Sequence, residues 1–190
     1  MNFHINLVVL CQTYFFLRVE RLSHRFMMPF LPRLLLSLFI INLGIALGAG
    51  LYESRIVLPE WLVRAPDGQL QWNPAAALAA NTGVRFWVYV TTVPLTLLTI
   101  ANLIAAWRTA TAARSWWLVA AVVAVLERAL TFGYFIPTMI YLTRPDGPIG
   151  ADAARIAIQW AQLDYLRHGL TLAALVAALQ AFAWLTERGR

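Results

Sequence analysis

Four ionisable side chains within long apolar segments are the residues best placed to do chemistry: Glu127, Asp164, Arg167 and His168. Charged groups inside a membrane are costly and usually face the interior of a helix bundle. The chemistry open to this set is proton transfer, with His168 as the base and Asp164 or Glu127 orienting its imidazole. Arg167 would then stabilise an enolate-like oxyanion. The alternative interpretation is a structural network without catalysis.

Helical spacing predicts which other polar side chains share a face with these four. An α-helix advances about 100° per residue, so residues three and four positions apart lie on one stripe. A polar stripe of this spacing begins at Glu127 in the third apolar segment, and a polar face begins at Trp160 in the fourth. We therefore expect a pocket lined by seven further side chains: Asn42, Glu53, Thr131, Tyr134, Thr138, Tyr141 and Trp160.

Depth along the helices predicts an ion pair between the third and fourth segments. At about 1.5 Å per residue, Glu127 lies roughly 17 Å from one end of its segment, and Arg167 and His168 lie roughly 15 Å from the opposite end of theirs. These depths are similar in a hydrocarbon core about 30 Å thick. We expect Glu127 to pair with Arg167 or His168, and the alternative is a local pair with Arg128.

Most of these polar residues fall between the middle of the membrane and its outer face. One interpretation is a buried hydrogen-bond network that fixes helix packing. The other is an outward-opening pocket for a lipophilic molecule with one or two polar groups.

The composition indicates a membrane protein. Of the 190 residues, 61% are hydrophobic and 13% are charged, and the mean hydropathy is +0.66, whereas soluble domains have about 25% charged residues. This excludes a disordered protein, a nucleic-acid module and an ordinary cytosolic enzyme. The lone Cys11 excludes an internal disulfide. The predicted fold class is all-α, an integral membrane four-helix bundle over residues 31–187, with helices at 34–51, 86–106, 116–142 and 158–185.

Features between and within these helices add further expectations. The one longer extracytoplasmic loop, over residues 52–85, forms either a partly ordered cap or a simple connector. Gly44 and Gly48 form a GxxxG spacing that predicts close helix contact. Pro94 and Pro137 are expected to kink their helices.

Arginine distribution predicts the orientation, because short cytoplasmic loops are enriched in basic residues. One side of the predicted bundle has five arginines, at positions 55, 64, 85, 144 and 155. The other has eight, at positions 18, 21, 25, 33, 108, 114, 188 and 190. We expect a bacterial inner-membrane protein with both termini in the cytoplasm. Residues 1–30 form a separate tail. Either this tail is an interfacial amphipathic helix, or the start codon is assigned too early and translation begins at Met27 or Met28.

No metal or cofactor is expected. His168 is the single histidine in the predicted helices, so a bis-histidine haem is disfavoured, and the sequence has no phosphate-binding glycine loop. The expected partners are membrane lipid, a lipophilic small molecule, and a second copy or another membrane protein; nucleic acid is not expected.

Three stretches carry a resemblance to a known family: GAGLYESRIVLPEW from Gly48, ERALTFGYFIPTMIYL from Glu127 and WAQLDYLRHGLTLAALVAAL from Trp160. The chain resembles the anthrone-oxygenase-like family, small four-helix membrane proteins that are mostly of unknown function in bacteria. The resemblance implies four transmembrane helices. Fungal members are associated with cofactor-free oxidation of polyketide anthrones by oxygen, a substrate that does not carry over to this chain.

Three functions are compatible with these features. The first is binding or oxidising an aromatic or quinone-like lipophile. The second is a non-catalytic subunit of a membrane complex, in which the ionic groups serve assembly. The third is a proton-coupled carrier, although four helices are few for a transporter that does not oligomerise.

Overall fold

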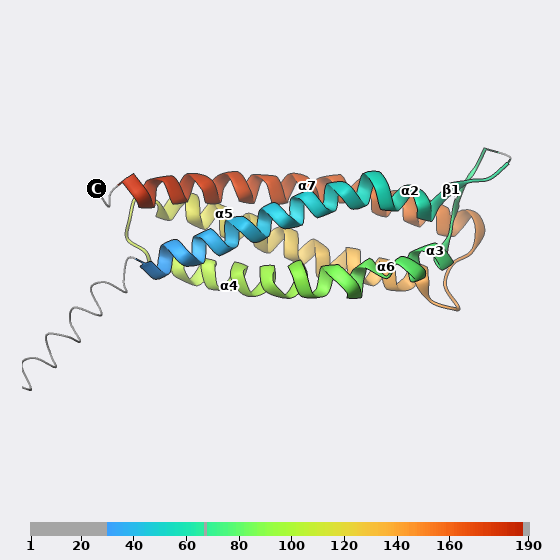
Figure 1. The fold of residues 1–190 in the computed structure, drawn as a ribbon, viewed down its shortest axis with the longest axis horizontal. Coiled ribbons are helices and arrows are strands. Elements are labelled where there is room, and N and C mark those ends of the chain that lie inside the picture. Colours follow the sequence, from blue (N-terminus) through green and yellow to red (C-terminus); the bar gives the residue numbers. More distant parts are fainter. Residues whose placement is uncertain (1–29, 67, 188–190) are drawn as a thin grey trace, which may run out of the picture.

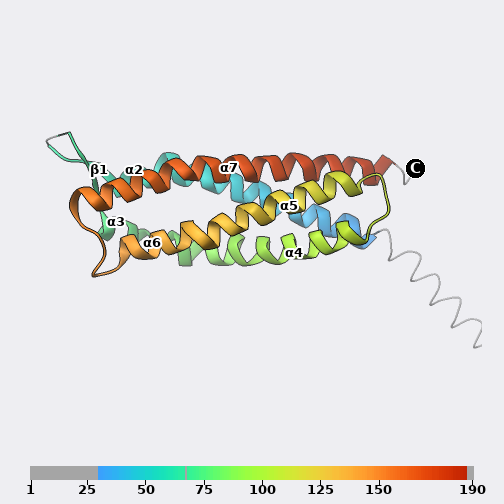
Figure 2. The ribbon, with the colours of Figure 1, turned by 180° about the vertical axis from the view of Figure 1, so that it is seen from behind.

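The computed structural model describes residues 30–66 and 68–187, which are mostly helical. Four helices are long and apolar enough to cross a membrane, and we call them spans 1 to 4: Phe30–Trp61, Gly83–Arg108, Arg114–Thr143 and Gly150–Thr186. They lie side by side in an elongated bundle (Figures 1 and 2). Each predicted apolar segment lies inside one span. The N-terminal tail, apart from Phe30, lies outside the described residues.

The spans are built from α-helical and π-helical segments. Span 1 runs through η1 (Glu53–Val57) into α2 (Leu58–Trp61), and span 2 consists of η2 (Gly83–Thr92) and α4 (Val93–Arg108). Span 3 consists of α5 (Arg114–Leu130), η3 (Thr131–Phe135) and α6 (Ile136–Thr143), and span 4 lies within α7 (Gly150–Glu187). Pro94 and Pro137 stand in the first turns of α4 and α6, directly after a π-helical segment. The first turn of a helix tolerates a residue without an N–H group.

The connection between spans 1 and 2 is an ordered cap on one end of the bundle. Strands β1 (Leu62–Arg64) and β2 (Leu70–Trp72) form an antiparallel hairpin, and α3 (Pro74–Ala80) follows. The Trp72 indole N–H donates to the Leu142 carbonyl oxygen at 3.0 Å. The Trp72 ring also packs edge to face against Trp61, with 6.2 Å between the ring centroids. The segment is therefore a cap and not a simple connector, and its hairpin is a departure from a purely helical fold.

Two hydrophobic clusters hold the bundle together at different heights. The first, away from the cap, is centred on Leu36, Phe39 and Trp117 and contains small residues of α5 and α7. The second, beside the cap, includes Trp61 and Trp160. Helix contact at Gly44 and Gly48 was predicted but is not seen in the described chain, because open space faces both glycines.

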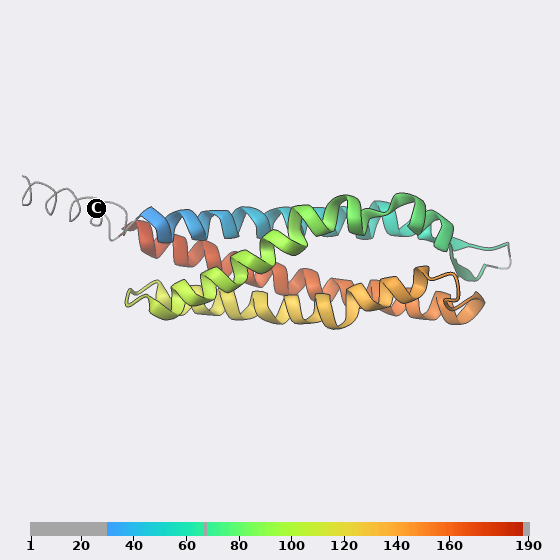
Figure 3. The same ribbon diagram turned by 90° about the horizontal axis from the view of Figure 1, so that it is seen from below.

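Span 2 changes neighbours along its length. Its α4 half packs along α5, whereas η2 lies toward span 1 (Figure 3). The η2 segment therefore diverges from the η3 and α6 part of span 3. This divergence lies at the height where the ionisable side chains of the bundle gather.

Candidate functional site

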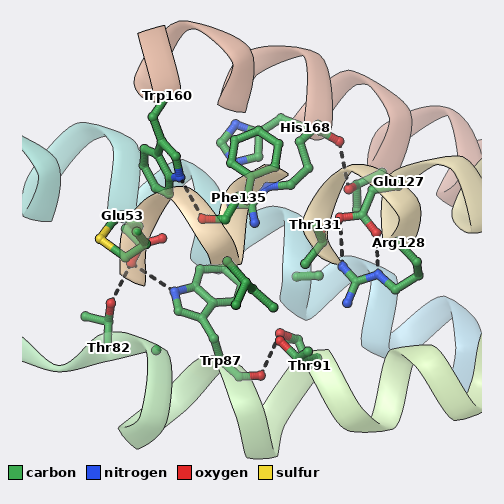
Figure 4. A pocket seen from close by; sticks show the side chains of 17 residues that line it. Glu53, Thr82, Trp87, Thr91, Glu127, Arg128, Thr131, Phe135, Trp160 and His168 are labelled. Atoms are coloured by element: carbon green, nitrogen blue, oxygen red, sulfur yellow. Dashed lines mark hydrogen bonds and ion pairs between the residues drawn. The ribbon is translucent and has the colours of Figure 1, made fainter. Parts of the chain in front are cut away.

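A partly open cavity of about 100 Å³ lies where span 2 diverges from span 3, and Figure 4 shows its walls. All four spans contribute side chains to it. The lining residues are Ala46, Glu53, Thr82, Gly83, Trp87, Thr91, Thr92, Glu127, Arg128, Thr131, Phe135, Ile136, Met139, Trp160, Arg167, His168 and Thr171.

The three π-helical segments of the described chain all reach this cavity. Segment η1 contributes Glu53, η2 contributes Trp87 and Thr91, and η3 contributes Thr131 and Phe135. A π-helical turn is wider and less favourable than an α-helical turn, and such turns occur frequently at functional sites. Their coincidence at one height marks the cavity as the place where regular helix packing is interrupted.

The π-helical segment of span 3 also corrects the predicted polar stripe. The stripe from Glu127 continues to Thr131, but the wider turn of η3 then shifts the helix phase by about one residue. Phe135, Met139 and Leu142 consequently continue the inward face. The side chains predicted to do so are Tyr134, Thr138 and Tyr141, and they do not belong to the lining.

Of the remaining predicted lining residues, some line the cavity and one does not. Glu53 and Trp160 line the cavity, whereas Asn42 does not. The Asn42 side-chain amide donates to the Val90 carbonyl oxygen at 2.9 Å and so joins span 1 to η2. Thr82 lines the cavity but precedes the predicted segment 86–106, so hydropathy alone could not find it.

Glu127 forms a buried, two-pronged ion pair with its neighbour Arg128. The two nitrogen–oxygen distances are 2.6 and 2.7 Å, and the Thr131 hydroxyl donates to the same carboxylate at 3.0 Å. The predicted pair with Arg167 or His168 was therefore wrong. The flexible arginine stem covers the angle between adjacent side chains, and the guanidinium fork matches a carboxylate.

A second ionic group lies on α7. Asp164 Oδ1 is 2.6 Å from Arg167 Nη2, and Asp164 Oδ2 accepts a hydrogen bond from Ser54 at 2.9 Å. His168 Nε2 lies 3.4 Å from the same Oδ2 atom. The Arg167 guanidinium also lies over Phe135, 4.6 Å from the ring centroid. Of the two acids predicted to orient His168, Asp164 is thus the one beside it.

His168 is packed directly against span 1 at Gly50. A Cβ atom built on Gly50 would overlap the imidazole Nε2 atom. Neither ring nitrogen of His168 has a hydrogen-bond partner in the described chain. The imidazole therefore takes its position from packing against Gly50, with Asp164 beside it.

Glu53 is held differently from the other two acids. Its Oε1 atom accepts hydrogen bonds from the Thr82 hydroxyl at 2.8 Å and from the Trp87 indole at 2.9 Å. The residue is only 6% exposed. Over residues 30–66 and 68–187, no cationic side chain lies within ion-pair distance of its carboxylate.

Within the part of the chain that the structure describes, no group of three or more His, Cys, Asp or Glu side chains could hold a metal ion. Comparisons with protein-family models, curated proteins and solved structures find no match to this chain. The resemblance to anthrone-oxygenase-like proteins stays a prediction, and the function has to be argued from the cavity itself.

Proposed function

We propose that this chain is an integral membrane protein that binds a compact lipophilic molecule with one polar group in the cavity between its four spans. The observation that carries the proposal is the cavity itself, which three π-helical segments border and ionisable side chains line. A concave site with apolar walls and a few convergent polar groups is the usual form of a small-molecule site.

The outer surface of the bundle supports insertion in a membrane. Large apolar side chains such as Leu97, Ile100 and Val176 are more than half exposed on the spans. Exposed apolar surface of this extent marks contact with lipid or with another protein. Because such side chains occur on all four spans, surrounding lipid is the simplest occupant.

The size of the cavity narrows the ligand class. A cavity of roughly 150 Å³ is enough to bind benzene, so about 100 Å³ in a partly open site fits the head group of a single-ring molecule. A fused polycycle would require the spans to move apart. The divergence of η2 from span 3 offers the ligand a lateral path from the lipid into the cavity. An apolar tail of the ligand would remain in that opening.

Native mass spectrometry of gently purified protein tests this proposal. We expect a stoichiometric bound small molecule on the wild-type chain, identified by lipid and metabolite analysis of the released material. The variant A46F fills the cavity and should lose that mass. The control G44F lies two residues away and faces open space, so it should keep the mass. A folded wild-type protein without bound small molecule, in fixed ratio with a second protein, would favour the subunit function instead.

We further propose the bacterial inner membrane as the location, with both termini in the cytoplasm. Both ends of the described chain lie at the end of the bundle opposite the cap (Figure 1), and Arg33 donates to the Leu185 carbonyl oxygen there at 3.1 Å. In a C11S background, we expect Q71C in the cap to react with a membrane-impermeant maleimide on intact cells, and A110C to react only after permeabilisation. The opposite labelling pattern would reverse the orientation.

A further inference from the structure

The charged side chains around the cavity do not balance. Glu53 and Glu127 line the cavity with Arg128 and Arg167, and a third buried carboxylate, that of Asp164, lies behind the lining. Three carboxylates thus stand against two guanidinium groups. Each guanidinium is already committed at 2.6 Å: Arg128 pairs with Glu127, and Arg167 pairs with Asp164. Glu53 is the acid left without a cation.

The immediate surroundings of Glu53 cannot neutralise an ionised carboxylate. Thr82, which directly precedes η2, and Trp87 within it are neutral donors. Both reach Oε1, so Oε2 accepts no hydrogen bond from the described residues. On α7, the nearest charges are those of Arg167 and Asp164, which largely cancel because they pair with each other. Burying an ionised carboxylate without a partner is costly. The site therefore needs one further positive charge.

His168 is poorly placed to supply that charge. Its Nε2 atom faces the Asp164 carboxylate, which already binds Arg167 and accepts a hydrogen bond from Ser54. Glu127, which lines the cavity with this histidine, is bound by Arg128. A proton on His168 would find both neighbouring acids occupied, whereas a proton on Glu53 removes the unbalanced charge directly.

Aromatic side chains line the cavity together with Glu53. The Trp87 indole N–H points to Glu53, and Trp160 donates to the Phe135 carbonyl oxygen at 3.2 Å on the opposite side of the cavity (Figure 4). The faces of such rings attract cations. Arg167 already uses this property, because its guanidinium carbon lies 5.6 Å from the Trp87 ring centroid and 4.6 Å from that of Phe135.

We propose that the ligand of this cavity is a compact organic monocation, and that it takes the place of a proton on Glu53. This inference rests on the proposed function and specifies the ligand class. In the empty cavity, Glu53 carries a proton. When an ammonium group binds, the Glu53 O–H bond breaks, the carboxylate pairs with the ammonium, and one proton leaves to solvent. No other group around the cavity changes its charge.

The test uses three single-ring probes of similar shape and different charge: benzylammonium, benzyl alcohol and benzoate. The full chain is purified into lipid nanodiscs, and binding is followed by calorimetry in two buffers of different ionisation enthalpy. We expect benzylammonium to bind best and to release about one proton per molecule bound. Its affinity should rise about tenfold per pH unit while Glu53 is protonated.

The variant E53Q keeps an acceptor oxygen for Thr82 and Trp87 but carries no proton to exchange. We expect it to weaken benzylammonium binding by about thirtyfold or more, to abolish proton release, and to leave benzyl alcohol binding nearly unchanged. The control E60Q removes an exposed acid of the same span and should behave as wild type. The variant H168N, whose side chain lines the cavity, can bind benzylammonium more weakly, but each molecule bound should still release about one proton.

Several outcomes would overturn this inference: benzylammonium binding to the wild-type protein without proton release, unchanged binding in E53Q, or benzylammonium binding to H168N without proton release. If E53Q fails to fold, the buffer and pH dependence of the wild-type protein decide alone. If benzyl alcohol binds tightly and benzylammonium does not, the proposed function stands and the inference that the ligand is a cation is rejected. Failure of all three probes, with no small molecule in the native mass spectrum, would reject both.

Discussion

Replacing Arg128 with methionine is expected to destabilise the protein by about 3–5 kcal/mol. The substitution keeps the length of the side chain but removes both donors that Glu127 receives from the guanidinium. Glu127 is only 3% exposed, so little contact with water would compensate for their loss. Thr131 would remain as its one hydrogen-bond donor. The measurement is the free energy of unfolding in mixed detergent micelles, followed by circular dichroism.

A double-mutant cycle separates the pair from its individual residues. The double variant E127Q/R128M removes both charges and should recover a large part of the lost stability, because neither charge is then left buried alone. The control R114M removes an exposed arginine of the same span and should change stability by less than about 0.5 kcal/mol. Additive effects of E127Q and R128M would show that the pair is not coupled and would contradict this prediction.

The presence of four long apolar helices could be predicted from sequence because hydropathy accumulates over some 20 residues. The spans extend beyond the predicted segments at their polar ends. Span 4, for example, begins at Gly150 and not at residue 158. The eight residues before Ile158 include Asp152 and Arg155, both exposed, and hydropathy alone does not mark them as helical.

The details of the site were less predictable, for two physical reasons. The polar stripe of span 3 was extrapolated with the period of a regular α-helix, and η3 breaks that period between Thr131 and Phe135. Ion pairing was predicted from depth and angle alone, whereas the length of the arginine stem lets Arg128 reach the adjacent Glu127. A single sequence carries neither the position of a π-helical turn nor the choice between a local and an interhelical partner.

The glycines of span 1 show the same limit. The GxxxG spacing draws attention to Gly44 and Gly48, yet open space faces both. The glycine that permits a close approach is Gly50, two residues beyond the motif, because it receives the His168 imidazole. What selects Gly50 is the histidine on another span, which no spacing within span 1 can reveal.

Replacing Gly50 is therefore expected to have the second large effect on stability. The variant G50L places four carbon atoms where the imidazole lies, and we expect a loss of about 3 kcal/mol, at the upper end of the usual cost of overpacking. The smaller variant G50A should lose about 1 kcal/mol, because the gain in helix propensity of alanine over glycine offsets part of the overlap. Thermal unfolding in the same detergent measures both losses.

A matched pair of variants decides whether His168 is the cause. In G50A/H168A the overlap is gone, so the double variant should be more stable than the sum of its two single changes predicts. The control G48L points into open space and should stay within about 0.5 kcal/mol of wild type. The nuclear magnetic resonance signals of the His168 ring should shift in G50A and not in G48L, because only the former moves the imidazole away from Asp164. Equal losses of stability in G48L and G50L would show that the cost arises in the helix backbone and not from overlap with His168.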